Sequence, residues 1–301
     1  MKKLLLSALV LGMALFMSCS KKSDSAASSG DSGGPVSLKR LHETYQKEHV
    51  LFVEWNEETQ TWDTTEYQSA NYYLTTTYNW DGDKLISWGN GDWAYCNLYY
   101  NNSGLVSKIV KRTNSGHEEA DTVYLYYNEK NQIIKFDRYE YKWDVGPGTG
   151  DWEFTTWDIT YSNDKPVMAT SSNNLKMQLT WTGDNITEIQ YFMDNEMFDK
   201  YTYTYDNSIN PTYGFNCWDA LGCGGGKNYG GMINYASFSS KNNVLHQESL
   251  DIPEWHIHGE IYDYTYKYNG NYPIEREYSK LYENATHIEI VNRGNRFTYL
   301  D

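Results

Sequence analysis

The sequence predicts an all-β protein, and three observations carry this prediction. Tyrosine occurs 29 times and tryptophan 11 times in 301 residues, while the mean hydropathy is only −0.73. Such a chain suits sheets with one dry and one wet face, because a buried tyrosine ring can still extend its hydroxyl to water. Aromatic residues also recur at every second position, which is the period of a strand. After residue 37 the sequence contains no aliphatic stripe of helical period over roughly twelve residues or more.

The N-terminal segment has the features of an export signal. Two lysines precede a mostly apolar run at residues 4–16, which is shorter than the ~20 residues of a membrane span. The segment resembles bacterial lipoprotein signal peptides, although Phe16 stands where leucine is commonest. We therefore expect residues 1–18 to be cleaved and the mature chain to start at a lipidated Cys19. The alternative is an ordinary secretory signal that leaves Cys19 as a thiol.

Lipidation would place the protein in the cell envelope, at the outer membrane, facing either the periplasm or the cell surface. Residues 19–37 are almost entirely Ser, Gly, Ala, Lys and Asp, a composition that cannot bury enough apolar surface to fold. We expect this segment to be a flexible tether. No second linker of this kind follows, so residues 38–301 are predicted to form one domain.

Charge limits the choice of partners. The formal net charge is −15, from 40 acidic and 25 basic side chains. Nucleic acid and anionic lipid surfaces bind basic patches, so neither is expected as a partner. Contact with the membrane is expected through the N-terminal lipid alone, and no cofactor is predicted.

Alternation of aromatic or aliphatic with polar residues marks individual strands. It is strict at residues 176–181, 201–205 and 262–268, and looser at 93–100 and 152–161. Segments of five to eight such residues are typical of strands with two different faces.

The strands are separated by a recurring unit in which an aromatic residue is followed by Asn, Asp or Gly and then by an apolar segment. These units lie at residues 78–82, 100–104, 127–131, 181–185 and 205–210. Asn, Asp and Gly tolerate the positive φ that hairpin loops need. The spacing of the units is too irregular for a solenoid. We therefore predict a long antiparallel meander of hairpins that forms an open curled sheet or a partial barrel, with a glycine-rich insertion at about 210–240.

These units resemble YD-type hairpin repeats. The stretches 203–211, 239–244 and 264–273 are also similar to a family of Bacteroidetes lipoproteins of unknown function with a porin-like, all-β domain. The resemblance implies a fold and a compartment, and no catalytic residues. It does not imply a transmembrane barrel, since the positions between the tyrosines carry Thr, Lys, Asp and Gln where membrane strands need an apolar band.

One short motif could bind a metal ion. On a strand, His256, His258 and Glu260 would share a face, and two imidazoles with a carboxylate can hold zinc with open positions. Such a site would suit a metal-dependent hydrolase. We favour the alternative of a solvated strand face, because no fourth ligand can be placed.

The remaining cysteines allow one pairing. Cys217 and Cys223 lie close together in the glycine-rich stretch and could form a disulfide in a compartment outside the cytoplasm. Cys96 would then be a free, buried thiol in a strand.

Aromatic residues in polar loops give the main functional hypothesis. Trp143 and Trp152 flank a glycine-rich loop, and Trp218 and Tyr229 lie in the 210–240 insertion. Exposed rings are natural platforms for sugar faces or peptide side chains. The structural alternative is that Trp143 and Trp152 form a cross-strand pair that closes a hairpin.

The sequence contains no nucleophile elbow and no HExxH helix, so we do not predict an enzyme. The leading prediction is a lipid-anchored binding module for a glycan or another polymer. The two alternatives are a scaffold with an envelope-protein partner and the metal-dependent hydrolase.

Overall fold

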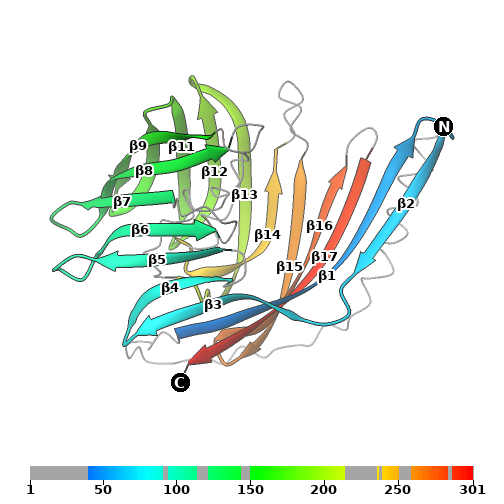
Figure 1. Cartoon of the computed structure of the whole chain (residues 1–301), viewed down its shortest axis with the longest axis horizontal. Coiled ribbons are helices and arrows are strands. Elements are labelled where there is room, and N and C mark those ends of the chain that lie inside the picture. The colour runs from blue at the N-terminus through cyan, green and yellow to red at the C-terminus, as the bar shows by residue number, and fades with distance from the viewer. Residues whose placement is uncertain are drawn as a thin grey trace. The chain divides into compact units, whose positions relative to one another are not determined.

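The computed structural model describes residues 40–90, 94–113, 121–143, 150–213, 236, 239–250, 259–283 and 287–300. The predicted signal peptide, Cys19 and the tether lie outside these residues. The described residues form seventeen β-strands (Figure 1), so the all-β prediction is confirmed. No helix within them is long and apolar enough to cross a membrane.

The strands follow one another with short connections in most places. They are β1 (Arg40–Asn56), β2 (Thr61–Gln68), β3 (Tyr73–Asp81), β4 (Lys84–Asn90), β5 (Ala94–Tyr100), β6 (Val106–Thr113), β7 (Asp121–Tyr127), β8 (Ile133–Trp143), β9 (Gly150–Ser162), β10 (Lys165–Ser171), β11 (Leu175–Thr182), β12 (Asn185–Met193), β13 (Glu196–Ile209), β14 (Asn242–Ser249), β15 (Glu260–Asn269), β16 (Tyr272–Glu283) and β17 (His287–Leu300).

The sheet closes on itself. From β3 onward, each strand pairs antiparallel with the next one in the chain. The first and last strands complete the ring, with a register that runs from Arg40↔Leu300 to Glu54↔His287. On its other edge β1 pairs with β2 along one part of its length and with β3 along another. The result is a closed 16-strand barrel.

Closure corrects the prediction of an open curled sheet or a partial barrel. The pairing of β1 with β17 joins strands from opposite ends of the domain. Local periodicity predicts strands and hairpins, but it contains no signal for a pairing of such large sequence separation.

Turn chemistry explains most of the hairpins. Two-residue loops at Asn163-Asp164 and Asp194-Asn195 have positive φ at both positions, as tight hairpin turns require. At the end of β5, the side-chain oxygen of Asn101 accepts bonds from the backbone N–H groups of Ser103 and Leu105, both at 3.0 Å. The Asn and Asp residues of the predicted units therefore hold the loops closed.

One predicted turn is wrong. Residues 205–210 do not close a hairpin, because β13 continues to Ile209. The Asp206 carboxylate accepts a local bond from the Ser208 backbone N–H at 2.9 Å, and it also accepts bonds across strands from the backbone N–H of Asn243 at 3.1 Å and from its side-chain amide at 3.2 Å. It thereby ties β13 to β14.

Part of the barrel interior is a packed apolar core. Ile109, Met177, Ile186 and Ile189 have no exposed surface, and the cluster to which they belong draws side chains from β4 to β14. The alternating apolar residues of these strands therefore point inward. On the opposite part of the ring, formed by β14–β17 with β1 and β3 (Figure 1), inward positions carry polar and aromatic side chains that line a cavity.

A ring of hydrogen bonds joins neighbouring hairpins at one rim of the barrel. In eight described cases, an aromatic residue late in an odd-numbered strand donates its hydroxyl or indole N–H to a backbone carbonyl. The carbonyl lies early in the neighbouring strand that precedes it in the barrel. These pairs are Trp80–Leu41, Tyr100–Leu85, Tyr127–Val106, Tyr161–Ile133, Trp181–Pro166, Tyr205–Ile186, Tyr266–Val244 and Tyr299–Pro273. The aromatic residues of the predicted units thus have a structural role. In the unit at 78–82 the donor is Trp80.

Tyr127→Phe tests this role. The Tyr127 hydroxyl lies 2.6 Å from the Val106 carbonyl oxygen, and loss of that donor should lower the free energy of unfolding by about 0.5–1.5 kcal/mol. Tyr99→Phe is the matched control, because Tyr99 is 46% exposed and should change stability by less than about 0.5 kcal/mol. Urea denaturation of both variants measures the difference. Equal losses would contradict a structural role for the rim bonds.

Candidate functional site

The cavity inside the barrel has a volume of about 550 Å³. Its walls come from β14–β17, β1 and β3, together with the segment 210–212 that follows β13. A cavity of this size is within the range of small-molecule binding sites. It is the candidate functional site.

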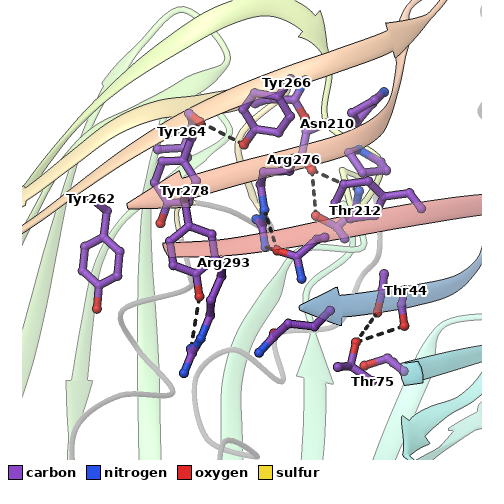
Figure 2. Close-up of a pocket in the computed structure, with 18 of the residues that line it drawn as sticks. Thr44, Thr75, Asn210, Thr212, Tyr262, Tyr264, Tyr266, Arg276, Tyr278 and Arg293 are labelled. Carbon is purple, nitrogen blue, oxygen red and sulfur yellow. Dashed lines mark hydrogen bonds between the residues drawn. The ribbon is translucent and has the colours of Figure 1, made fainter. Parts of the chain in front are cut away.

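Stacked tyrosines form one wall. The strict alternation of β15 points Tyr262, Tyr264 and Tyr266 into the cavity, and register places Tyr278 of β16 opposite Tyr264 (Figure 2). Ring centroids of Tyr264 and Tyr278 lie 5.4 Å apart, and those of Tyr262 and Tyr264 lie 6.3 Å apart. Burial raises the pKa of both Tyr262 and Tyr264 well above the ordinary value. These hydroxyls therefore stay protonated at neutral pH.

Most charged groups of the cavity are paired. The Arg293 guanidinium lies 3.0 Å from a carboxylate oxygen of Glu48 and donates to the Tyr278 hydroxyl at 3.1 Å. Lys280 is 2.8 Å from Glu260 and 3.4 Å from Glu289. These contacts cross from strand to strand, so they also fix the positions of the side chains that carry them.

Arg276 has a different environment. Its Nε and Nη2 groups donate to the side-chain oxygen of Asn295 at 3.2 and 2.9 Å, and it is also hydrogen-bonded to Tyr266. The guanidinium carbon lies 5.5–5.8 Å from the ring centroids of Tyr264, Tyr278 and Phe297. All of these neighbours are neutral, and no carboxylate in the described part of the chain forms an ion pair with Arg276.

Amides and hydroxyls complete the lining. Asn210 donates to the Ser240 carbonyl at 2.9 Å and accepts from the Thr212 hydroxyl at 2.8 Å (Figure 2). On the β1 side, the Thr44 and Thr75 hydroxyls are 3.1 Å apart. The cavity therefore combines flat aromatic faces with many neutral hydrogen-bonding groups.

The predicted metal site is only partly described. His256 and His258 lie outside the described residues. Glu260 lies in β15, where its carboxylate pairs with Lys280 and accepts a bond from the Tyr262 hydroxyl at 2.9 Å. Among described side chains, no group of three His, Cys, Asp or Glu is arranged to hold a metal ion.

Trp152 is the one predicted aromatic binding residue whose side chain is described. It is 43% exposed, and together with Tyr124, Tyr126 and Tyr139 it lines a second, shallower cavity of about 470 Å³ on β7–β9. Trp152 is opposite Tyr141 in the sheet, and Trp143 is opposite Gly150. Trp143 and Trp152 are therefore not directly opposite each other, and the register makes them diagonal neighbours on the two strands.

The other predicted sites in the 210–240 insertion, Trp218, Tyr229 and the cysteines 217 and 223, lie outside the described residues. Cys96 is a free thiol and buried in β5, as expected.

Sequence reasoning did not identify Arg276, Tyr278 or Arg293 as members of a site. A signal was present, since Arg276, Tyr278 and Lys280 alternate in phase along one strand. It becomes meaningful only when the pairing of this strand with the tyrosine-rich β15 is known.

Comparisons with known proteins give distant structural likeness alone. No family model matches the sequence, and no curated protein matches it. A porin-like protein from Bacteroides uniformis is similar in structure, with 11% identity and a TM-score of 0.45 over 84% of this chain and 97% of that chain. A porin-like protein from Bacteroides vulgatus has 8% identity and a TM-score of 0.30 over 87% of this chain and 99% of that one. The closed barrel rests on the strand pairing of this chain itself.

Proposed function

We propose that the protein is a lipid-anchored binding protein of the cell envelope whose barrel lumen holds a short glycan segment. The observation that carries this proposal is the cavity wall in which stacked tyrosines stand beside side-chain amides and hydroxyls. Sugar rings present both C–H faces, which pack on aromatic rings, and hydroxyls, which exchange hydrogen bonds with amides. A volume of about 550 Å³ accommodates roughly one to three sugar residues.

The outward face of β15 and β16 supports a position in water, outside the hydrocarbon layer. Between the lumenal tyrosines of β15 lie Asp263, Thr265 and Lys267, all exposed. On the neighbouring strand Glu275 faces the same way, with a carboxylate oxygen 2.5 Å from the Lys267 ammonium. Charged side chains at lipid-facing positions cost up to ~2–4 kcal/mol each near the bilayer centre. We therefore propose attachment through a lipid on Cys19.

Glycan binding can be tested with the full-length chain carrying Cys19→Ala, which removes the proposed lipid. Short oligosaccharides that bind on an array are measured by calorimetry against this protein and against the same protein with Tyr264→Ala. Removal of a wall ring should weaken binding by about 5- to 150-fold, since stacking on an aromatic platform contributes roughly 1–3 kcal/mol. Tyr124→Ala, on the outer face, is the matched control and should bind as the parent does.

The Tyr124→Ala control also distinguishes the lumenal site from a second candidate site on the outer face. The exposed rings of Tyr124, Tyr139 and Trp152 favour a glycan chain on the outer cavity. Loss of binding in Tyr124→Ala with full binding in Tyr264→Ala would contradict the lumenal site and favour the outer one. Absence of any glycan signal in the parent protein would contradict both.

A further inference from the structure

The lumen contains one basic side chain, Arg276, that forms no ion pair with a carboxylate of the described residues. Of the charged residues that line the cavity, Arg276, Lys280 and Arg293 are basic and Glu289 is acidic. Lys280 is neutralised by Glu260 and Glu289, and Arg293 by Glu48. Arg276 has only neutral partners among the described residues. The three basic residues and the carboxylates of Glu48, Glu260 and Glu289 sum to zero charge, but a guanidinium whose direct neighbours are all neutral still attracts an anion to its own position.

The neighbours of Arg276 hold the guanidinium in place without neutralising it. Ring faces at 5.5–5.8 Å stabilise a cation by roughly 0.5–2 kcal/mol, and Asn295 fixes the orientation of the planar group through two bonds. A guanidinium has five N–H donors. Asn295 takes two and the hydrogen bond with Tyr266 takes one, so two donors remain for a molecule in the cavity.

We infer that the lumen recognises an acidic sugar whose carboxylate is bound by Arg276. This inference rests on the proposed glycan-binding function and names its ligand class. A single guanidinium without a carboxylate partner suits a monoanion, and its planar group fits the two oxygens of a carboxylate. The rings of Tyr264 and Tyr278, tilted by 38° to each other, flank the same group, so a carboxylate attached to a sugar ring meets the cation and the aromatic faces together.

The test uses two probes that differ in one group, a disaccharide ending in glucuronic acid and the same disaccharide ending in glucose. Calorimetry with the Cys19→Ala protein should show the acid binding roughly 10- to 100-fold more tightly, as expected for a charge-assisted hydrogen bond. The preference should shrink as salt is raised. Arg276→Gln should bring the ratio of the two affinities close to one, whatever change it makes to the affinity for the neutral disaccharide, and Arg276→Lys should retain part of the preference.

Binding of the neutral disaccharide also shows that each variant is folded. If the parent protein binds both disaccharides equally, the carboxylate inference is overturned while the glycan proposal stands. If Arg276→Gln binds the neutral disaccharide and keeps the full preference for the acid, Arg276 is not the recognition group and the inference is again overturned. If the parent binds neither disaccharide nor any other glycan, the proposed function itself fails.

Discussion

Replacing Phe136 by alanine should lower the free energy of unfolding by about 3–5 kcal/mol. Phe136 is only 1% exposed, and its ring stacks on that of Trp157 with centroids 5.8 Å apart and an interplanar angle of 12°. The substitution removes the ring from the centre of the apolar cluster and leaves a cavity that neighbouring strands cannot fill, because each is fixed by two ladders of backbone bonds. Urea denaturation followed by tryptophan fluorescence measures the loss.

Phe154→Ala is the matched control. Phe154 lies on β9, the strand that pairs with β8, but it is 48% exposed and makes one ring contact, with Tyr139 at 4.8 Å. Its removal should cost no more than about 1 kcal/mol. If the two variants are equally destabilised, the assignment of inward and outward faces on β8 and β9 is wrong.

Local features of the fold could be predicted from the sequence because strands and tight turns are encoded by near neighbours. The alternation at 262–268 predicts one tyrosine face, and the structure confirms that three of these rings point into the cavity. The units around Asn101 and Asn131 are turns, as their chemistry indicates. The unit at 205–210 does not close a hairpin, because β13 continues to Ile209 and Asp206 bonds Asn243 of β14 as well as the nearby Ser208 N–H.

Closure and the site could not be predicted, because both depend on pairing between distant strands. The ion pair between Glu48 and Arg293 joins β1 to β17, and neither residue has a distinctive local setting in the sequence. The predicted binding residues were chosen as aromatics in polar loops. In the structure, the tyrosines of the cavity wall lie within the regular strands β15 and β16. Their alternation in the sequence looks the same as that of ordinary core residues. Of the four predicted residues, Trp152 alone has a described side chain, and it is exposed but lies in strand β9.

Raising the pH above 10 should destabilise the barrel steeply. Burial raises the pKa of Tyr161 to about 12, and it raises the pKa of Tyr201 and Tyr203 further. In the unfolded chain, tyrosines ionise near pH 10. The unfolded state therefore loses protons above pH 10 while the folded state keeps them. The stability from these groups is fully present below pH 10 and is lost as the pH rises toward the folded values.

At pH 11 each fully buried tyrosine should reduce the free energy of unfolding by roughly 1 kcal/mol. Urea midpoints at pH 9, 10 and 11 measure the fall, and absorbance at 295 nm counts the tyrosinates in the native and denatured protein. Tyr203→Phe removes a tyrosine that is only 4% exposed. The decrease in the free energy of unfolding between pH 9 and pH 11 should then be smaller by the contribution of that one tyrosine. Equal tyrosinate counts at pH 11 in the native and denatured protein would show that water reaches these hydroxyls in the folded barrel. The assignment of these tyrosines to a water-excluding apolar core would then be wrong.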